Sequence, residues 1–117
     1  ATMPTSDRRL LKQRAIREIW IAALQDGLRQ GAAAAVNELR RYLRPWGTCW
    51  AEQRTAVDLW HGDQDAVVPL SHSRWLAQRL QSARLHTMHK HGHFSTPVEC
   101  IDQILQPFRD TSPRRNA

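Results

Sequence analysis

The sequence has no long apolar run, only two cysteines and five glycines. None of its apolar runs approaches the roughly 18 residues that a membrane-spanning helix needs. The first residues, ATMPTSDRRLLKQR, lack the apolar centre of a secretory signal. Two cysteines, Cys49 and Cys100, do not make a disulfide framework, and we expect free thiols. We therefore expect a cytoplasmic protein with no membrane partner.

The charge is strongly biased to one sign but is not concentrated. Seventeen Lys and Arg residues face eleven Asp and Glu residues, which gives a formal net charge of +6. A basic domain can attract nucleic acid, yet these charges are scattered over several segments. No glycine-rich phosphate loop or aromatic-interleaved basic stripe accompanies them. We interpret them as solvated helix faces and expect neither a nucleic-acid partner nor a cofactor.

The remaining pattern describes one small α/β unit of 117 residues. Apolar residues at spacings of three and four predict helices over 8–25 and 30–43. Short apolar segments predict strands over 56–60 and 83–88, with a helix from 71 or 72 to 80 between them. Thr96, Pro97 and Glu99 fit a capping box that opens a last helix reaching about residue 109. Residues 1–7 and 110–117 are predicted to be disordered.

The element order indicates how the strands lie. A strand, a helix and a second strand form a βαβ unit, which implies parallel strands covered by helices. Two parallel strands alone leave unpaired backbone at both outer edges. We therefore expect an α/β fold that is the end of a larger sheet.

An acid and a histidine follow the two predicted strands. Asp65 comes after the first strand, in DLWHGDQDAVVP, and His93 comes 28 residues later, after the second strand. Both side chains are then expected at the carboxyl ends of neighbouring parallel strands, where open α/β sheets build their sites. A carboxylate there can accept the Nδ1 hydrogen of the imidazole and leave the other nitrogen to take a proton from a nucleophile. This arrangement is the acid–base half of a catalytic triad.

At these residues the chain resembles the C-terminal part of the α/β-hydrolase superfamily. The first motif of that family matches Gly62, Asp65, Val68 and Pro69, and a later Gly-His matches Gly92 and His93. The resemblance implies that Asp65 is the triad acid and His93 the base. It also implies a division into a lead-in (1–7), a helical cap-like segment (8–50), a core segment (51–109) and a disordered tail (110–117). The complete protein is expected to hydrolyse an ester-like or amide-like small molecule.

The nucleophile that such a triad needs is missing from the sequence. The family places a serine in a Gly-x-Ser-x-Gly turn upstream of the acid, or in some members an aspartate. The segment GLRQG, residues 27–31, has the glycine spacing but carries Arg29 at its centre. Ser71, Ser73, Ser82 and Ser95 all follow the acid. Because the chain also begins with Ala, we expect a C-terminal fragment that is inactive by itself.

Three alternatives remain open. Asp63 competes with Asp65 for the acid role, but the family motif favours Asp65 as the acid and leaves Asp63 as a turn residue. In the second alternative, the chain is a non-enzymatic fragment that pairs its open sheet edge with a second copy or with an N-terminal partner segment. His89, His91 and His93 alternate along the chain, so an extended backbone would aim all three at one zinc ion. We predict Asp65 and His93 as the site residues and expect no metal site.

Overall fold

The computed structural model describes residues 2–29, 31–45, 47 and 49–109. The chain divides into two compact units. One unit contains the residues up to Leu10 and those from Trp50 onward, and the other is Leu11–Cys49. The residues of the predicted disordered tail, 110–117, lie outside the described residues.

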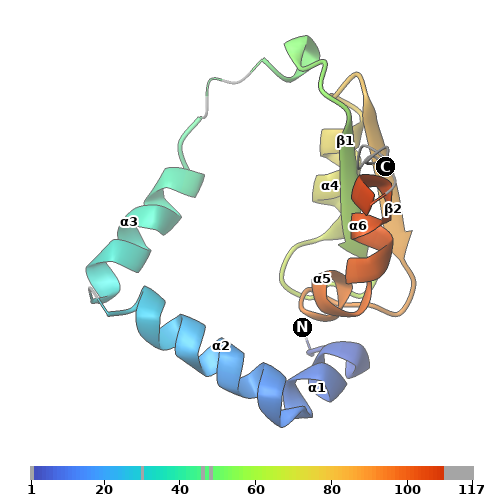
Figure 1. The fold of residues 1–117 in the computed structure, drawn as a ribbon. Coiled ribbons are helices and arrows are strands. Elements are labelled where there is room, and N and C mark those ends of the chain that lie inside the picture. The colour runs from blue at the N-terminus through green and yellow to red at the C-terminus, as the bar shows by residue number, and fades with distance from the viewer. Residues whose placement is uncertain (1, 30, 46, 48, 110–117) are drawn as a thin grey trace, which may run out of the picture. The chain divides into compact units, whose positions relative to one another are not determined.

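The first unit is a βαβ arrangement with flanking helices (Figure 1). Strands β1 (Val57–Gly62) and β2 (Ala83–Met88) pair in parallel, with Val57 opposite Ala83 and Gly62 opposite Met88. Helix α4 (Leu70–Ala77) packs on both strands, while α5 (Ser95–Glu99) contacts β1. Figure 1 shows α6 (Ile101–Arg109) on the face of the sheet opposite α4. The predicted fold class, two parallel strands with flanking helices, is confirmed.

Strand alternation assigns side chains to the two faces. His61 bonds to Ser73 of α4, so the odd-numbered residues of β1 face that helix. The even-numbered residues Asp58 and Trp60 face α6, where both meet His86 of β2. The sheet of the described residues has these two strands, and each pairs with the other. Both outer edges are therefore open to a further strand.

The first helix corrects two predictions about the N-terminal segment. Helix α1 spans Thr5–Lys12, so the predicted disorder is wrong for residues 5–7, while residue 1 lies outside the described residues. The predicted helix over 8–25 is also divided, because Gln13 has an extended backbone and α2 begins at Arg14. Ser6, Asp7 and Leu10 are buried in the first unit, and local periodicity does not report such distant contacts.

The second unit consists of helices α2 (Arg14–Gly27) and α3 (Ala32–Tyr42). Neither helix has a buried residue, and Ile21, Leu24, Leu39 and Leu43 are among its exposed apolar side chains. No helix among the described residues is long and apolar enough to cross a membrane. A short 3₁₀ helix, η1 (Trp50–Glu52), precedes β1.

The helical region near the C-terminus begins earlier in the sequence than predicted. Helix α5 starts at Ser95, so Thr96 lies inside the helix and the predicted capping box is wrong. The Thr96 hydroxyl donates instead to the Gly92 carbonyl oxygen at 2.7 Å. The Cys100 thiol is buried, and burial raises its pKa; Cys100 and Cys49 are both free thiols, as predicted.

Candidate active site

The parallel register brings the two loops of the site to one edge of the sheet. Gly62 and Met88 are register partners at the carboxyl ends of β1 and β2. The segment with Asp65 leaves β1 at this edge, and the segment with His93 leaves β2 beside it. The two loops also bond directly, since the Gln64 N–H donates to the His91 carbonyl oxygen at 3.0 Å. The carboxyl ends of both strands thus share one site.

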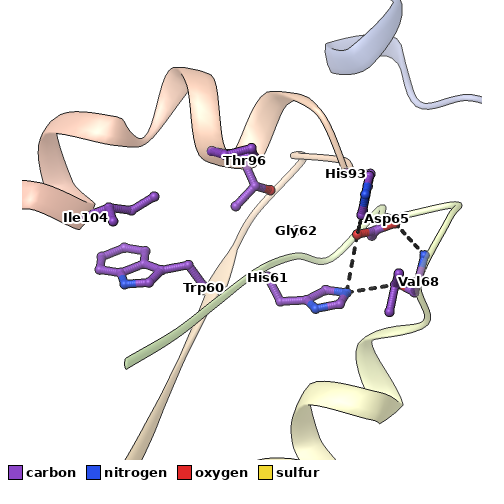
Figure 2. A pocket seen from close by; sticks show the side chains of 9 residues that line it. Trp60, His61, Gly62, Asp65, Val68, His93, Thr96 and Ile104 are labelled. Carbon is purple, nitrogen blue, oxygen red and sulfur yellow. Dashed lines mark hydrogen bonds and ion pairs between the residues drawn. The ribbon is translucent and has the colours of Figure 1, made fainter. Parts of the chain in front are cut away.

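Asp65 and His93 form a hydrogen-bonded pair at that edge (Figure 2). The His93 Nδ1–H donates to Asp65 Oδ2 at 2.9 Å. The side chain of Asp65 is 6% exposed and that of His93 is 38% exposed. An ionised carboxylate only accepts hydrogen bonds, so Nδ1 carries the proton and Nε2 is left as the basic nitrogen. The predicted proximity of the two residues is confirmed, while their catalytic role stays a prediction.

Backbone donors hold the Asp65 carboxylate on its other side. The N–H groups of Val67 and Val68 both donate to Oδ1 at 2.8 Å. Burial by itself raises the pKa of Asp65, but the hydrogen bonds from Val68, His93 and Val67 outweigh it and lower the pKa overall. Asp65 is therefore ionised at neutral pH and available as the acceptor of the His93 proton.

His61 is a site residue that sequence reasoning missed. It is only 7% exposed, and its Nε2 lies 3.6 Å from Asp65 Oδ2. Its Nε2–H donates to the Val68 carbonyl oxygen at 3.0 Å, and its Nδ1 lies 2.7 Å from the Ser73 hydroxyl. The carbonyl can only accept, which fixes the proton on Nε2 and makes Ser73 the donor to Nδ1. The strand is predicted to end at residue 60 but extends to Gly62, so His61 is a strand residue whose side chain faces α4.

A pocket of about 340 Å³ opens beside the pair. Its walls are mostly apolar, and Figure 2 shows Trp60 and Ile104 on the side away from Asp65. The complete lining is Trp60, His61, Gly62, Asp65, Val68, His93, Thr96, Pro97 and Ile104. Among the described residues, no hydroxyl, thiol or carboxylate hydrogen-bonds to His93 Nε2. The basic nitrogen thus belongs to a residue that lines the pocket.

The other carboxylates of this edge have structural partners. Asp63 accepts hydrogen bonds from His89 Nδ1 and from the Lys90 N–H, both at 2.7 Å. Lys90 has a φ of 62°, a left-handed conformation that costs about 1 kcal/mol outside glycine. Burial acts to raise the pKa of Asp63, but its hydrogen bonds from His89 and Lys90 lower it overall. Asp63 therefore stabilises the turn after β2, and it does not contact His93.

The three alternating histidines bind different partners. His89 bonds to Asp63, His91 lies 3.3 Å from Glu99, and His93 bonds to Asp65. Within the part of the chain that the structure describes, no three His, Cys, Asp or Glu side chains are grouped so that they could hold a metal ion. The turns at residues 89–90 and 93–94 interrupt the extended backbone that a shared zinc site required. The structure therefore does not support the zinc alternative.

A second carboxylate–imidazole pair shows how unspecific such a pair is by itself. Asp58 Oδ1 lies 2.7 Å from His86 Nε2, also at a separation of 28 residues. The hydrogen bond from His86 lowers the pKa of Asp58. Both side chains are 36% exposed and belong to the strands rather than to the loops beyond them. What distinguishes Asp65 and His93 is the buried carboxylate and the position at the strand ends.

Asp7 is the other residue of this region that the sequence did not predict. Its carboxylate accepts hydrogen bonds from the Ser95 N–H at 2.8 Å, the Ser95 hydroxyl at 2.6 Å and the Phe94 N–H at 3.3 Å. These contacts join residues 87 and 88 positions apart. No local pattern around Asp7 reports them, since the segment reads as a polar lead-in.

Part of the chain is similar in sequence to a curated esterase. A pimeloyl-[acyl-carrier protein] methyl ester esterase from Aromatoleum aromaticum is 40% identical over 67 residues, which cover 55% of this chain and 27% of that esterase. The chain thus spans about a quarter of the length of that relative. No protein-family model matches, and no solved structure matches. This similarity and the two motifs at Asp65 and His93 relate the chain to the α/β-hydrolase superfamily.

Proposed function

We propose that the chain supplies the acid and the base of a hydrolytic triad whose nucleophile belongs to another segment of a longer polypeptide. The observation that carries this proposal is the His93 imidazole, whose Nδ1 is held by the buried Asp65 carboxylate at 2.9 Å. Its second nitrogen belongs to a residue that lines an apolar pocket. The chain matches only 27% of its esterase relative, which agrees with a partial site.

The proposed chemistry follows from the proton on Nδ1. A nucleophilic hydroxyl gives its proton to His93 Nε2 as its oxygen attacks an ester carbonyl. The Asp65 carboxylate stabilises the imidazolium formed at that moment. His93 then returns the proton to the leaving alcohol as the carbon–oxygen bond breaks, and a water molecule repeats the cycle on the acyl intermediate. The substrate class we propose is a carboxylic ester, by analogy with the methyl ester in the name of the relative.

The test is to express the complete open reading frame that encodes this chain and to measure hydrolysis of short-chain p-nitrophenyl and methyl esters. His93→Ala and Asp65→Asn are expected to lower kcat by about 10⁴-fold, the loss that follows removal of a triad member. Asp58→Asn and His72→Ala are matched controls, because Asp58 bonds to a different histidine and His72 is exposed. Both controls are expected to retain the full rate.

The 117-residue chain alone provides the complementary measurement. It is expected to show no labelling by a fluorophosphonate probe, because none of its serines stands in the Gly-x-Ser-x-Gly turn in which the family places its nucleophile. Labelling that disappears when one of its own serines is mutated contradicts the proposal. So does a complete reading frame whose esterase rate is unchanged by His93→Ala.

A further inference from the structure

The Asp7 carboxylate is buried, and uncharged donors bind it. Asp7 is 1% exposed, and no Lys, Arg or His among the described residues forms an ion pair with it. Its hydrogen-bond partners are the backbone N–H groups of Phe94 and Ser95 and the Ser95 hydroxyl. A buried charge is costly unless fixed donors compensate for it. The loop that follows β2 must therefore keep these donors aligned for Asp7 to remain buried.

The donors and contacts of Asp7 lie on both sides of His93. Phe94 and Ser95 follow the histidine, and Gly92 precedes it. A Cβ built on Gly92 would lie 2.4 Å from Asp7 Oδ2, so the carboxylate packs directly against the glycine backbone. Ser95 closes the loop from within, because its hydroxyl oxygen accepts the Gly92 N–H at 2.8 Å. His93 is thus the one residue of 92–95 that Asp7 does not contact in these interactions.

The His93 side chain depends on this backbone for its orientation. It is 38% exposed, and the side-chain hydrogen bond that holds it is the bond to Asp65. Its ring packs edge-on against Phe94 at 5.2 Å between centroids, and Phe94 is itself bound to Asp7 through its N–H. A shift of the loop by a fraction of the hydrogen-bond length would separate Nδ1 from the carboxylate.

We propose that Asp7 is a positioning residue for His93. It acts through the amides of Phe94 and Ser95 and aligns the imidazole with Asp65. The assignment rests on the proposed function, in which His93 is the general base. It differs from simple capping of α5, because capping would stabilise that helix without affecting the His93–Asp65 hydrogen bond.

The experiment uses the 117-residue chain, labelled with ¹⁵N and studied by NMR at neutral pH. The readout is the rate at which the His93 Nδ1–H proton exchanges with water, compared with the amide protons of β1 and β2. In Asp7→Ala we expect the Nδ1–H exchange rate to rise at least about tenfold while the strand amides stay protected, as expected for the loss of hydrogen bonds to a charged group. Asp7→Asn keeps one acceptor oxygen and is expected to give a smaller rise.

Two controls separate positioning from stability. Ser6→Ala changes the neighbouring buried hydroxyl, which has no hydrogen-bond partner among the described residues, and is expected to leave the Nδ1–H rate unchanged. Leu80→Ala removes a buried side chain away from the loop and is expected to raise strand-amide exchange without a separate effect on His93. If Asp7→Ala does not fold, the His93 Nδ1–H exchange rate of Asp7→Asn tests the positioning role instead.

The outcomes discriminate between the two proposals. A folded Asp7 variant in which the Nδ1–H rate stays within about twofold of the original chain overturns the positioning role and leaves the Asp65–His93 pair intact. An original chain without a hydrogen-bonded Nδ1–H signal contradicts the pair itself, and both proposals then fail. A rise confined to His93 supports the positioning role.

Discussion

Replacing Gly62 with alanine is expected to disrupt the site through the backbone. A Cβ at this position would lie 2.2 Å from the His91 carbonyl oxygen and 2.7 Å from Thr96 Oγ1, where real Cβ atoms stay beyond 3.0 Å. The His91 segment must therefore move by roughly 1 Å, and backbone cannot give way as a flexible side chain does. Overpacking of this kind costs about 2–3 kcal/mol of the free energy of unfolding.

The measurement for Gly62→Ala is native-state hydrogen exchange of the β1 and β2 amides, together with the chemical shifts of residues 91–93. Gly27→Ala is the matched control, since nothing lies within 4 Å of its added Cβ at the end of α2. The control is expected to be neutral or to stabilise its helix by up to about 1 kcal/mol. A Gly62→Ala chain within about 0.5 kcal/mol of the original, with unchanged shifts at 91–93, would refute the close packing of the two loops.

Three further predictions concern Asp65, His61 and the open sheet edges. Because the folded-state pKa of Asp65 lies below its unfolded value of about 3.9, the carboxylate stabilises the fold above that pH and loses this effect as the pH falls through the folded pKa. The difference in unfolding free energy between the original chain and Asp65→Asn should therefore shrink in urea titrations carried out from about pH 5 downward, and a constant difference contradicts this. His61→Leu leaves the Val68 carbonyl without its donor and should cost about 1–3 kcal/mol in the same titrations. His72→Leu, on an exposed helix position, should cost less than about 0.5 kcal/mol, and equal losses would refute the difference in burial. The chain should also associate with a second copy in sedimentation experiments, since the outer edges of β1 and β2 are open among the described residues; a monomer at all concentrations contradicts this.

The strand–helix–strand core could be predicted because its signals are local. The second strand was predicted over 83–88 and is found at Ala83–Met88. The turn residues around Asp65 and the spacing to His93 placed both side chains at the same sheet edge, and they lie 2.9 Å apart. Parallel pairing and a short crossover helix leave little freedom between these positions.

The support of the site could not be predicted in the same way. The first strand is predicted to end at residue 60, whereas in the structure it continues to Gly62 and includes His61, which is buried. Asp7 looked like part of a disordered lead-in because its partners, Phe94 and Ser95, are more than 85 residues away. A buried carboxylate of this kind is recognised only when its distant donors are placed around it.

Under the proposed function, one unit of the chain supplies both the acid and the base of the triad. The acid, the base and the residues that hold them all lie in one unit of the chain, the unit formed by the residues up to Leu10 and from Trp50 onward. The tautomer of His93 is thus set before any nucleophile is present, because Asp65 is already held by the N–H groups of Val67 and Val68. A segment that brings a nucleophile and oxyanion donors would meet a base that needs no reorganisation, and preorganised groups of this kind account for much of enzymatic rate enhancement. Mutations at Asp65 or Asp7 should then lower kcat more than they raise KM, because they disturb the proton acceptor and leave the apolar pocket walls in place.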